Sequence, residues 1–351
     1  MLAPSPSNAA PVTAAWVRSL PKAEVHVHLE GAIAPDHLAR LAEAAGEPLR
    51  PPFADLAQLL DFLDWSCGLV REPDDLRTLA YDFAARKHAS GVRCLDVVMN
   101  PTHWAPWRDR LPQMLDALDE GFARAERDGL PRAALCVSIL RTQTREQACA
   151  LAEQLVALRH PRVAALSIDG DEAAAGRTGA RFAPAFRIAR EGGLRTTAHA
   201  GESSGPEGVR DALELLEVER LDHGVRAIED AALVAELARR RVPLGVTPLA
   251  NLRLGMWGGH LPDHPVDALR RAGVRVSINT DDPVCPERSL EENYVRCAEA
   301  FGWSRADVAE MVRTGIEASF APPRLRDALL DELDDMTGAA RGAADTEKGS
   351  T

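Results

Sequence analysis

The feature that most constrains the fold is a regular alternation of eight strand-like runs with helical stretches along the 351 residues. Strict alternation of this kind is typical of parallel strands joined by crossover helices. Eight such units over roughly 250–300 residues match a (β/α)8 TIM barrel of the α/β class. The predicted strands lie at residues 22–29, 92–99, 134–140, 163–168, 194–200, 219–222, 242–246 and 274–279.

Polar clusters at the predicted strand ends favour a closed barrel over an open, doubly wound sheet. They follow the first, fourth, fifth, sixth and eighth strands, and only a closed barrel brings the first, fifth and eighth strands around one mouth. The sequence also predicts a helical insertion after the first strand and extra C-terminal helices. The insertion spans residues 53–65 and 73–90, and the C-terminal helices span 289–301, 305–319 and 323–336.

We expect one domain over residues 14–336, with flexible tails at 1–13 and 337–351 that are rich in small and polar residues. The net charge of −12 argues against nucleic acid or an anionic membrane as a partner, and no apolar run approaches the ~20 residues of a transmembrane helix. The six cysteines show no Cys-x-x-Cys spacing, and the N-terminus lacks the features of a signal peptide, which predicts a cytoplasmic protein. The expected partner is a small molecule, and the sequence predicts no oligomeric state.

Two histidines in the first strand are candidate metal ligands. His26 and His28 alternate with Val25 and Val27, so both imidazoles project from one face of the strand. A His-x-His pair alone is a weak signal, because most such histidines bind no metal. The pair gains weight from the polar residues at later strand ends, which are the groups that a hydrolytic zinc site needs.

Later strand ends supply His199, Glu202, His223, Asp281 and Asp282. Glu202 follows a glycine that allows a sharp turn, and a carboxyl beside a metal and out of water would favour its acid form. His223 could be a ligand, or a base that holds a metal-bound water. Adjacent Asp281 and Asp282 cannot easily face the same metal, so one is expected to be a ligand and the other to accept a hydrogen bond from substrate. The alternative roles are a helix-capping or surface acid for Glu202, a core histidine for His223 and a capped turn before Pro283 for Asp281 and Asp282.

The positions of the lysines in the sequence predict a site with one metal ion rather than two. Two-metal hydrolases on such barrels commonly bridge their metals with a modified lysine at the end of the fourth strand, and here that strand ends in Asp169-Gly170. None of the three lysines lies near it. One Zn²⁺ per chain is therefore expected. The predicted ligands are His26, His28, His199 and Asp281.

The combined motifs resemble the adenosine/adenine deaminase family of the metal-dependent amidohydrolase superfamily. They are His-Val-His-Leu-Glu-Gly-Ala (26–32), Gly-Asp-Glu (170–172), His-Ala-Gly-Glu (199–202), Leu-Asp-His-Gly-Val (221–225) and Asn-Thr-Asp-Asp-Pro (279–283). The resemblance implies that Glu202 protonates purine N1 while a zinc-activated hydroxide attacks C6. It also implies that His223 orients and deprotonates the zinc water and that Asp282 binds N7. The remaining substrate contacts that it implies are His28, Glu30 and the backbone of Gly170, which would meet N3.

The expected reaction is hydrolytic deamination of a 6-aminopurine in purine salvage, with adenosine or deoxyadenosine as substrate and inosine plus ammonia as products. Glu30 stands where adenosine deaminases usually carry Asp, and Thr247-Pro-Leu-Ala-Asn251 replaces a Cys-Pro-x-Ser-Asn type segment. Adenine and a modified 6-aminopurine nucleoside are therefore alternative substrates. Two further alternatives are a metal-dependent phosphoesterase, for which the sequence lacks a glycine-rich phosphate loop, and a non-catalytic purine-binding barrel.

Overall fold

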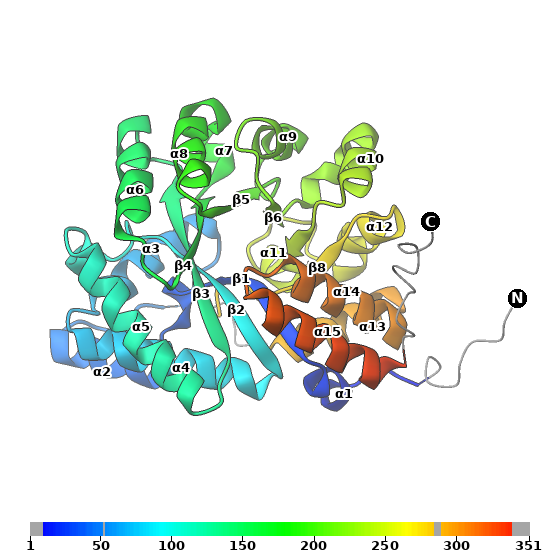
Figure 1. Cartoon of the computed structure of the whole chain (residues 1–351), viewed down its shortest axis with the longest axis horizontal. Helices are drawn as coiled ribbons and strands as arrows, with labels where there is room; N and C mark the ends of the chain where they lie inside the picture. Colours follow the sequence, from blue (N-terminus) through cyan, green and yellow to red (C-terminus); the bar gives the residue numbers. More distant parts are fainter. Residues whose placement is uncertain (1–9, 52, 284–288, 339–351) are drawn as a thin grey trace, which may run out of the picture.

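Eight parallel strands form the centre of the computed structural model, which describes residues 10–51, 53–283 and 289–338 (Figure 1). The strands follow one another around the sheet in chain order, and each pair of neighbours is parallel. The predicted (β/α)8 barrel is thus confirmed. The strands are β1 (Lys22–His28), β2 (Val92–Met99), β3 (Arg132–Leu140), β4 (Val163–Asp169), β5 (Arg195–Ala200), β6 (Arg220–His223), β7 (Leu244–Val246) and β8 (Val276–Ile278).

The seam between β8 and β1 closes the barrel through a short backbone bridge and side chains. Val27 and Asp281 form the bridge. Beside it, Asn279 Oδ1 accepts hydrogen bonds from the backbone N–H groups of Val25 (2.9 Å) and His26 (3.2 Å). These bonds satisfy buried donors where β8 is too short to pair. The seam therefore holds His26 and Asp281 side by side.

Helices surround the barrel, as Figure 1 shows. Helix α14 packs over β1 and β8, and α15 packs on α14, so the extra C-terminal helices cover the closing seam. The helices are α1 (Ala14–Ser19), α2 (Pro35–Ala45), α3 (Leu56–Gly68), α4 (Pro73–Ala89), α5 (Leu111–Arg127), α6 (Arg145–Leu158), α7 (Glu172–Ala175), α8 (Gly179–Glu191), α9 (Pro206–Glu214), α10 (Ala231–Arg240), α11 (Pro248–Arg253), α12 (Val266–Arg271), α13 (Leu290–Phe301), α14 (Arg305–Ala318) and α15 (Pro323–Thr337).

The predicted insertion after the first strand is present as α3 and α4, with a later start for α3 than the predicted residue 53. Asp55 sets that start, because its side chain accepts a hydrogen bond from the backbone N–H of Gln58 (2.9 Å). Strands β7 and β8 are shorter than predicted, and the short helix α11 after β7 was not predicted. Pro248 begins α11, where its missing N–H costs no hydrogen bond.

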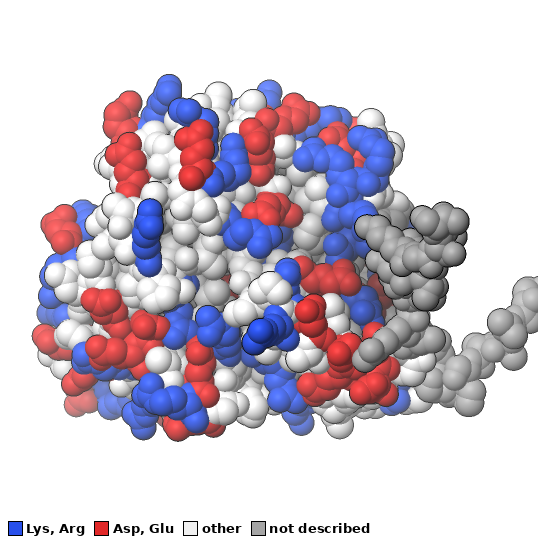
Figure 2. Space-filling model, in the orientation of Figure 1, with Lys and Arg blue, Asp and Glu red and all other residues white. Residues whose placement is uncertain are grey.

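The strands are buried on both faces, between the barrel interior and the helical layer, and every residue of β1 is buried. The five described cysteines are unpaired, and Cys285 lies outside the described residues. In the described part of the chain, no helix combines the length and apolarity that crossing a membrane requires. The predicted tails fall largely outside the described residues, and the domain limits stay a prediction. On the face shown in Figure 2, acidic and basic side chains are interspersed.

Candidate active site

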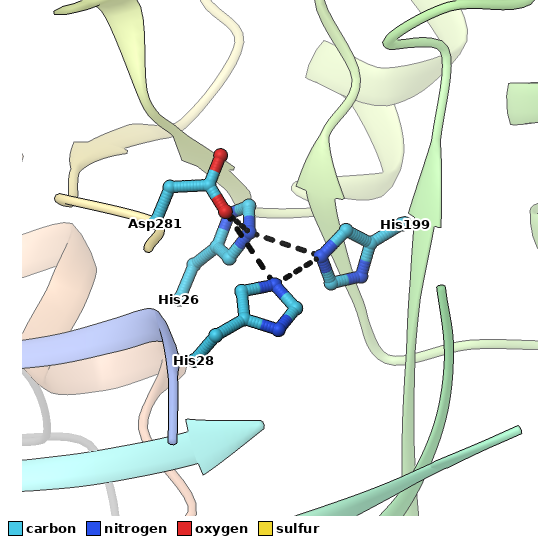
Figure 3. A group of neighbouring side chains, drawn as sticks. All are labelled: His26, His28, His199 and Asp281. Carbon is cyan, nitrogen blue, oxygen red and sulfur yellow. Dashed lines mark hydrogen bonds and ion pairs between the residues drawn. The ribbon is translucent and has the colours of Figure 1, made fainter. Parts of the chain in front are cut away.

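Four buried side chains converge at the mouth of the barrel (Figure 3). His28 Nε2 and His26 Nε2 lie 2.8 Å and 3.1 Å from His199 Nε2, and each lies 3.4 Å from Asp281 Oδ1. The two histidines of β1 reach this point together because alternate residues of a strand share a face. Strand β5 carries His199, and the segment that follows β8 carries Asp281. We call these residues, His26, His28, His199 and Asp281, the four-residue cluster.

The spacing of the four-residue cluster fits a metal ion. Zinc ligands lie about 2.0–2.1 Å from the ion, so the donor atoms of a tetrahedral site stand roughly 3.3 Å apart. The distances above, 2.8–3.4 Å, are of this size. Three imidazole nitrogens facing one another at such distances have no common proton arrangement that satisfies all three, whereas a shared cation satisfies them together. The donor set of three nitrogens and a carboxylate is typical of a divalent transition metal.

Groups behind the histidines set their orientation. Gly245 O lies 2.8 Å from His26 Nδ1, so the Nδ1–H donates to it and the Nε2 lone pair points into the cluster. Behind His199, the Asp222 carboxylate lies 3.7 Å from Nδ1. Burial, followed by the charges of neighbouring histidines, lowers the pKa of His199 well below its usual value. A neutral imidazole is the form that binds a metal.

Glu202 lies beside the four-residue cluster on the loop after β5. Its Oε1 accepts a hydrogen bond from Asn251 Nδ2 (3.3 Å) and lies 3.6 Å from His223 Nε2. Burial, followed by the negative charges of Asp281 and Glu172, raises the pKa of Glu202 well above its usual value. The carboxyl therefore favours its protonated form. With Oε1 as the acceptor for Asn251, the proton on Oε2 is available for a substrate nitrogen.

The orientation of Asn251 follows from its other neighbour, His264. His264 Nδ1 accepts a hydrogen bond from the backbone N–H of Val266 (3.2 Å), so its Nε2 carries the proton and donates to Asn251 Oδ1 (3.2 Å). Burial lowers the pKa of His264 to about 3, which keeps the ring neutral. The amide Nδ2 of Asn251 therefore faces Glu202.

Thr247 determines which nitrogen of His223 is free. Its hydroxyl donates to Asp281 Oδ2 (3.2 Å), so the same oxygen accepts from His223 Nδ1–H (3.2 Å). Asn251 Nδ2 also lies 3.3 Å from His223 Nδ1, so two groups compete for this nitrogen. Because the Asp281 carboxylate can only accept, the single hydroxyl proton of Thr247 goes to Asp281, and we assign a proton to Nδ1 and the lone pair of His223 to Nε2, the atom nearest Glu202. Burial lowers the pKa of His223 well below its usual value, so the ring is neutral and Nε2 is a proton acceptor. His223 and Asp281 both hold left-handed backbone conformations (φ 67° and 65°), which cluster at functional sites.

The remaining predicted residues also line this pocket. Asp282 packs against Gly31, where an added Cβ would lie 2.7 Å from its Oδ1. Burial and the charges of Asp281 and Glu30 raise the pKa of Asp282 to about 7, against the opposing charge of His28. Gly170 follows β4 at φ 95°. The pocket is lined by His28, Glu30, Leu56, Leu59, Leu60, Leu63, His103, Asp169, Gly170, His199, Glu202, His223, Leu254, Asp281 and Asp282.

The side chain of Glu30 points into the protein and does not extend outward as contact with a sugar would require. Its side chain is buried, and Oε1 accepts hydrogen bonds from the backbone N–H of Asn100 (2.8 Å) and from Trp104 Nε1 (2.7 Å). Its other oxygen lies 3.8 Å from His28 Nδ1. Glu30 thus supports His28 from behind as well as lining the pocket.

Several residues that line the pocket or support it from behind had no predicted role. Asn251 belongs to the 247–251 segment, which differs visibly from the family pattern. Its contact with Glu202 could not be predicted, because the two residues are 49 positions apart in the sequence. The four leucines of α3 have helical spacing, which equally predicts core packing. Asn100 and Asp169 form a buried side-chain pair 69 residues apart. Such pairings become visible only in the folded barrel.

Comparison with known proteins agrees with this geometry. A sequence model described as adenosine deaminase matches residues 21–336. The adenine deaminases of Rhodopseudomonas palustris and Cupriavidus metallidurans are 34% and 36% identical, covering 91% and 92% of this chain and 95% and 93% of their own. The crystal structure of adenine deaminase from Arthrobacter aurescens is 29% identical, with a TM-score of 0.85 over 91% of this chain and all of its own.

A second structure, an amidohydrolase from Burkholderia ambifaria with bound zinc, is 28% identical, with a TM-score of 0.82 over 94% of this chain and 96% of its own. The relatives support hydrolytic deamination of an adenine-type substrate. These relatives are named for adenine, which is the alternative substrate of the sequence analysis rather than the adenosine expected first. Sequence and geometry lead to one conclusion: this chain belongs to the adenosine deaminase family, whose members are metal-dependent amidohydrolases.

Proposed function

We propose that this protein is an adenine deaminase that converts adenine and water to hypoxanthine and ammonia. The observation that carries the proposal is the convergence of the four-residue cluster with the buried side chains of Glu202 and His223, which lie 3.6 Å apart in the same pocket. These are the groups that addition of water to C6 of an aminopurine requires. Zinc is the proposed metal. When bound by His26, His28, His199 and Asp281, it would lower the pKa of a water ligand toward about 7.

Different side chains of the pocket carry out the individual proton transfers of the reaction. His223 Nε2 accepts a proton from the attacking water, because its Nδ1 already donates to Thr247. Glu202 gives its proton to ring nitrogen N1, which makes C6 more electrophilic. Asp282 holds N7, and its protonated form, which a pKa of about 7 keeps about half populated at pH 7, can donate to that nitrogen. The amino group then takes the proton from His223, and the C6–N bond breaks as ammonia leaves. The hydroxyl at C6 gives its proton to the Glu202 carboxylate, which leaves the C6 carbonyl of hypoxanthine and restores both side chains.

The pocket walls favour a free base. The leucines at positions 56, 59, 60 and 63 of α3 and Leu254 form an apolar side of the pocket. A ribose placed against these leucines would leave its hydroxyls without hydrogen-bond partners, which costs binding energy. Only Oε1 of Glu30 is engaged with Trp104 and Asn100, and the buried Oε2, which has no hydrogen-bond partner among the described residues, can accept from a substrate N–H or O–H.

A phosphate-bearing substrate fits the pocket poorly. Among the described residues that line it, none is Lys or Arg, whereas Glu30, Asp169, Glu202, Asp281 and Asp282 are acidic. A phosphate group would meet unfavourable charge there. This argues against both the phosphoesterase alternative and a nucleotide substrate.

The test is an ultraviolet assay of the zinc-loaded protein with adenine, adenosine and 2′-deoxyadenosine in parallel, followed by metal analysis of the same sample. Conversion of adenine with little or no conversion of the nucleosides is the expected result. Faster conversion of adenosine would overturn the proposed substrate but not the reaction. If neither is converted by metal-loaded protein, a modified 6-aminopurine becomes the substrate to test. The Glu202→Gln variant is the matched control for contaminating deaminase.

A further inference from the structure

Strands β4 and β5 separate before they reach the mouth of the barrel. Their backbone pairing comprises Ala165 with Arg195 and Leu166 with Thr196, although β4 continues to Asp169 and β5 to Ala200. A cavity of about 340 Å³ lies at this seam. The loop after β5, which carries Glu202, therefore starts beside a gap in the sheet and needs another support.

The Glu172 carboxylate provides that support from the first residue of α7, shortly after β4. Its Oε1 accepts from the backbone N–H of Gly201 (3.0 Å) and from the hydroxyl of Ser204 (2.8 Å). Its Oε2 accepts from the backbone N–H groups of Glu202 (2.8 Å), Ser203 (3.3 Å) and Ser204 (3.4 Å). Consecutive N–H groups that converge in this way form a concave anion site, and here a buried side chain of the same protein fills it.

Two further contacts lock the two loops together. The hydroxyl of Ser203 accepts a hydrogen bond from the backbone N–H of Glu172 (3.1 Å), so each loop binds the backbone of the other. Arg141 Nη2 lies 3.6 Å from Glu172 Oε1 and also donates to the backbone carbonyl of His199. Gly201 turns the loop at φ 66°, and a Cβ there would lie 2.5 Å from Val209. The backbone of Glu202 is thus fixed on both sides.

We infer that Glu172 is a positioning residue that holds the 201–204 loop so that the Glu202 carboxyl faces the substrate. The inference rests on the proposed role of Glu202 as proton donor. Glu172 does not touch the pocket that contains the four-residue cluster. It acts through the backbone of the loop, and a displacement of about 1 Å at a reacting group is enough to cost about 100-fold in rate.

The experiment compares Glu172→Gln with a matched control, Glu207→Gln, in the wild-type and Glu202→Gln backgrounds. Glutamine keeps the size of the side chain but presents an amide N–H₂ to the converging N–H groups. Glu207 is exposed and accepts from one backbone N–H, that of Gly205, so its replacement should leave turnover unchanged. Turnover of adenine is measured with zinc content, and hydrogen exchange of the 200–205 backbone is measured by mass spectrometry.

The expected result for Glu172→Gln is a 10- to 100-fold loss of kcat, with KM within threefold and zinc retained. Exchange of the 200–205 amides should become at least tenfold faster. In the Glu202→Gln background, read by single-turnover assays at high enzyme concentration, the same change should cost less than twofold, because its effect passes through Glu202. Equal losses in both backgrounds, or unchanged exchange, would overturn the inference.

Two further measurements keep the inference testable if the Glu172→Gln variant does not fold or if the wild type does not convert adenine. If Glu172→Gln does not fold, Ser204→Ala removes one hydroxyl donor to Glu172 and should give a twofold to fivefold loss of kcat with the same local increase in exchange. If Ser204→Ala changes neither quantity, the inference is wrong. If the wild type does not convert adenine, the proposed function fails, and the exchange measurement still decides whether Glu172 holds the loop.

Discussion

The indole Nε1 of Trp104 donates a 2.7 Å hydrogen bond to Oε1 of Glu30, and both side chains are almost completely buried. The bond joins the loop after β2 to the end of β1, directly behind His28. Glu30 also accepts from the backbone of Asn100, so one carboxylate oxygen satisfies two buried donors. The extra methylene of Glu30, compared with the aspartate usual in adenosine deaminases, is used to reach these partners.

The Glu30→Asp variant should therefore lose activity on every substrate and should not become an adenosine deaminase. Aspartate withdraws the carboxylate by one methylene and leaves two buried donors unsatisfied, at about 1–3 kcal/mol each. We expect a fall of about tenfold or more in kcat/KM for adenine and a lower free energy of unfolding in urea. Trp104→Phe is the control that removes one donor alone. A rise in adenosine turnover in Glu30→Asp would show that Glu30 sets substrate choice.

Asp281 should be essential for metal retention. It is the carboxylate of the four-residue cluster, and its Oδ1 lies 3.4 Å from the Nε2 atoms of both His26 and His28. Asp281→Ala removes this ligand, and we expect the purified variant to hold less than about a tenth of the wild-type metal by mass spectrometry. Asp282→Asn, at the adjacent position, should keep its metal. Full zinc in Asp281→Ala would exclude Asp281 as a ligand.

The sequence predicts the barrel and the four-residue cluster well because both depend on short-range patterns. His26 and His28 follow the two-residue period of a strand, while His199 lies near the end of β5 and Asp281 shortly follows β8 in a closed barrel. The supports of the site are harder to predict. Glu172 and the loop that it holds are about 30 residues apart in sequence, and a glutamate after a strand is as well explained by helix capping.

Glu202→Gln should separate binding from chemistry. The amide keeps an oxygen that can accept from Asn251, so the pocket should remain assembled. It cannot deliver the proton that N1 requires. We expect kcat to fall by about 10²- to 10⁴-fold, the usual range for loss of a general acid, with metal content and KM little changed. Steady-state kinetics with metal analysis measures both, and turnover near the wild-type rate would mean that another acid donates the proton.

Thr247→Val tests the assignment of the free nitrogen of His223. Valine has nearly the same shape as threonine but lacks the hydroxyl that donates to Asp281 and accepts from His223 Nδ1. Without this acceptor the proton can move to Nε2, where it blocks the proposed base. We expect kcat to fall about tenfold, while Thr247→Ser, which keeps the hydroxyl, stays within threefold of the wild type. Equal kinetics in the valine and serine variants would show that Thr247 does not set the tautomer.

Asn279→Ala should weaken the closing seam of the barrel. The side-chain Oδ1 of Asn279 accepts from the backbone N–H groups of Val25 and His26, and both donors are buried. Alanine leaves the two donors without this acceptor, at about 1–3 kcal/mol each, so we expect a loss of about 2–6 kcal/mol in the free energy of unfolding in urea. Ser277→Ala removes a long 3.4 Å bond to Leu244 O and one acceptor of Asn279 Nδ2 (3.1 Å) but leaves the Oδ1 bonds of Asn279 in place, so it should cost less than Asn279→Ala. Because His26 belongs to the four-residue cluster proposed to bind the metal, Asn279→Ala should also weaken metal binding. A variant with wild-type stability would show that β8 and β1 are held by the Val27–Asp281 bridge alone.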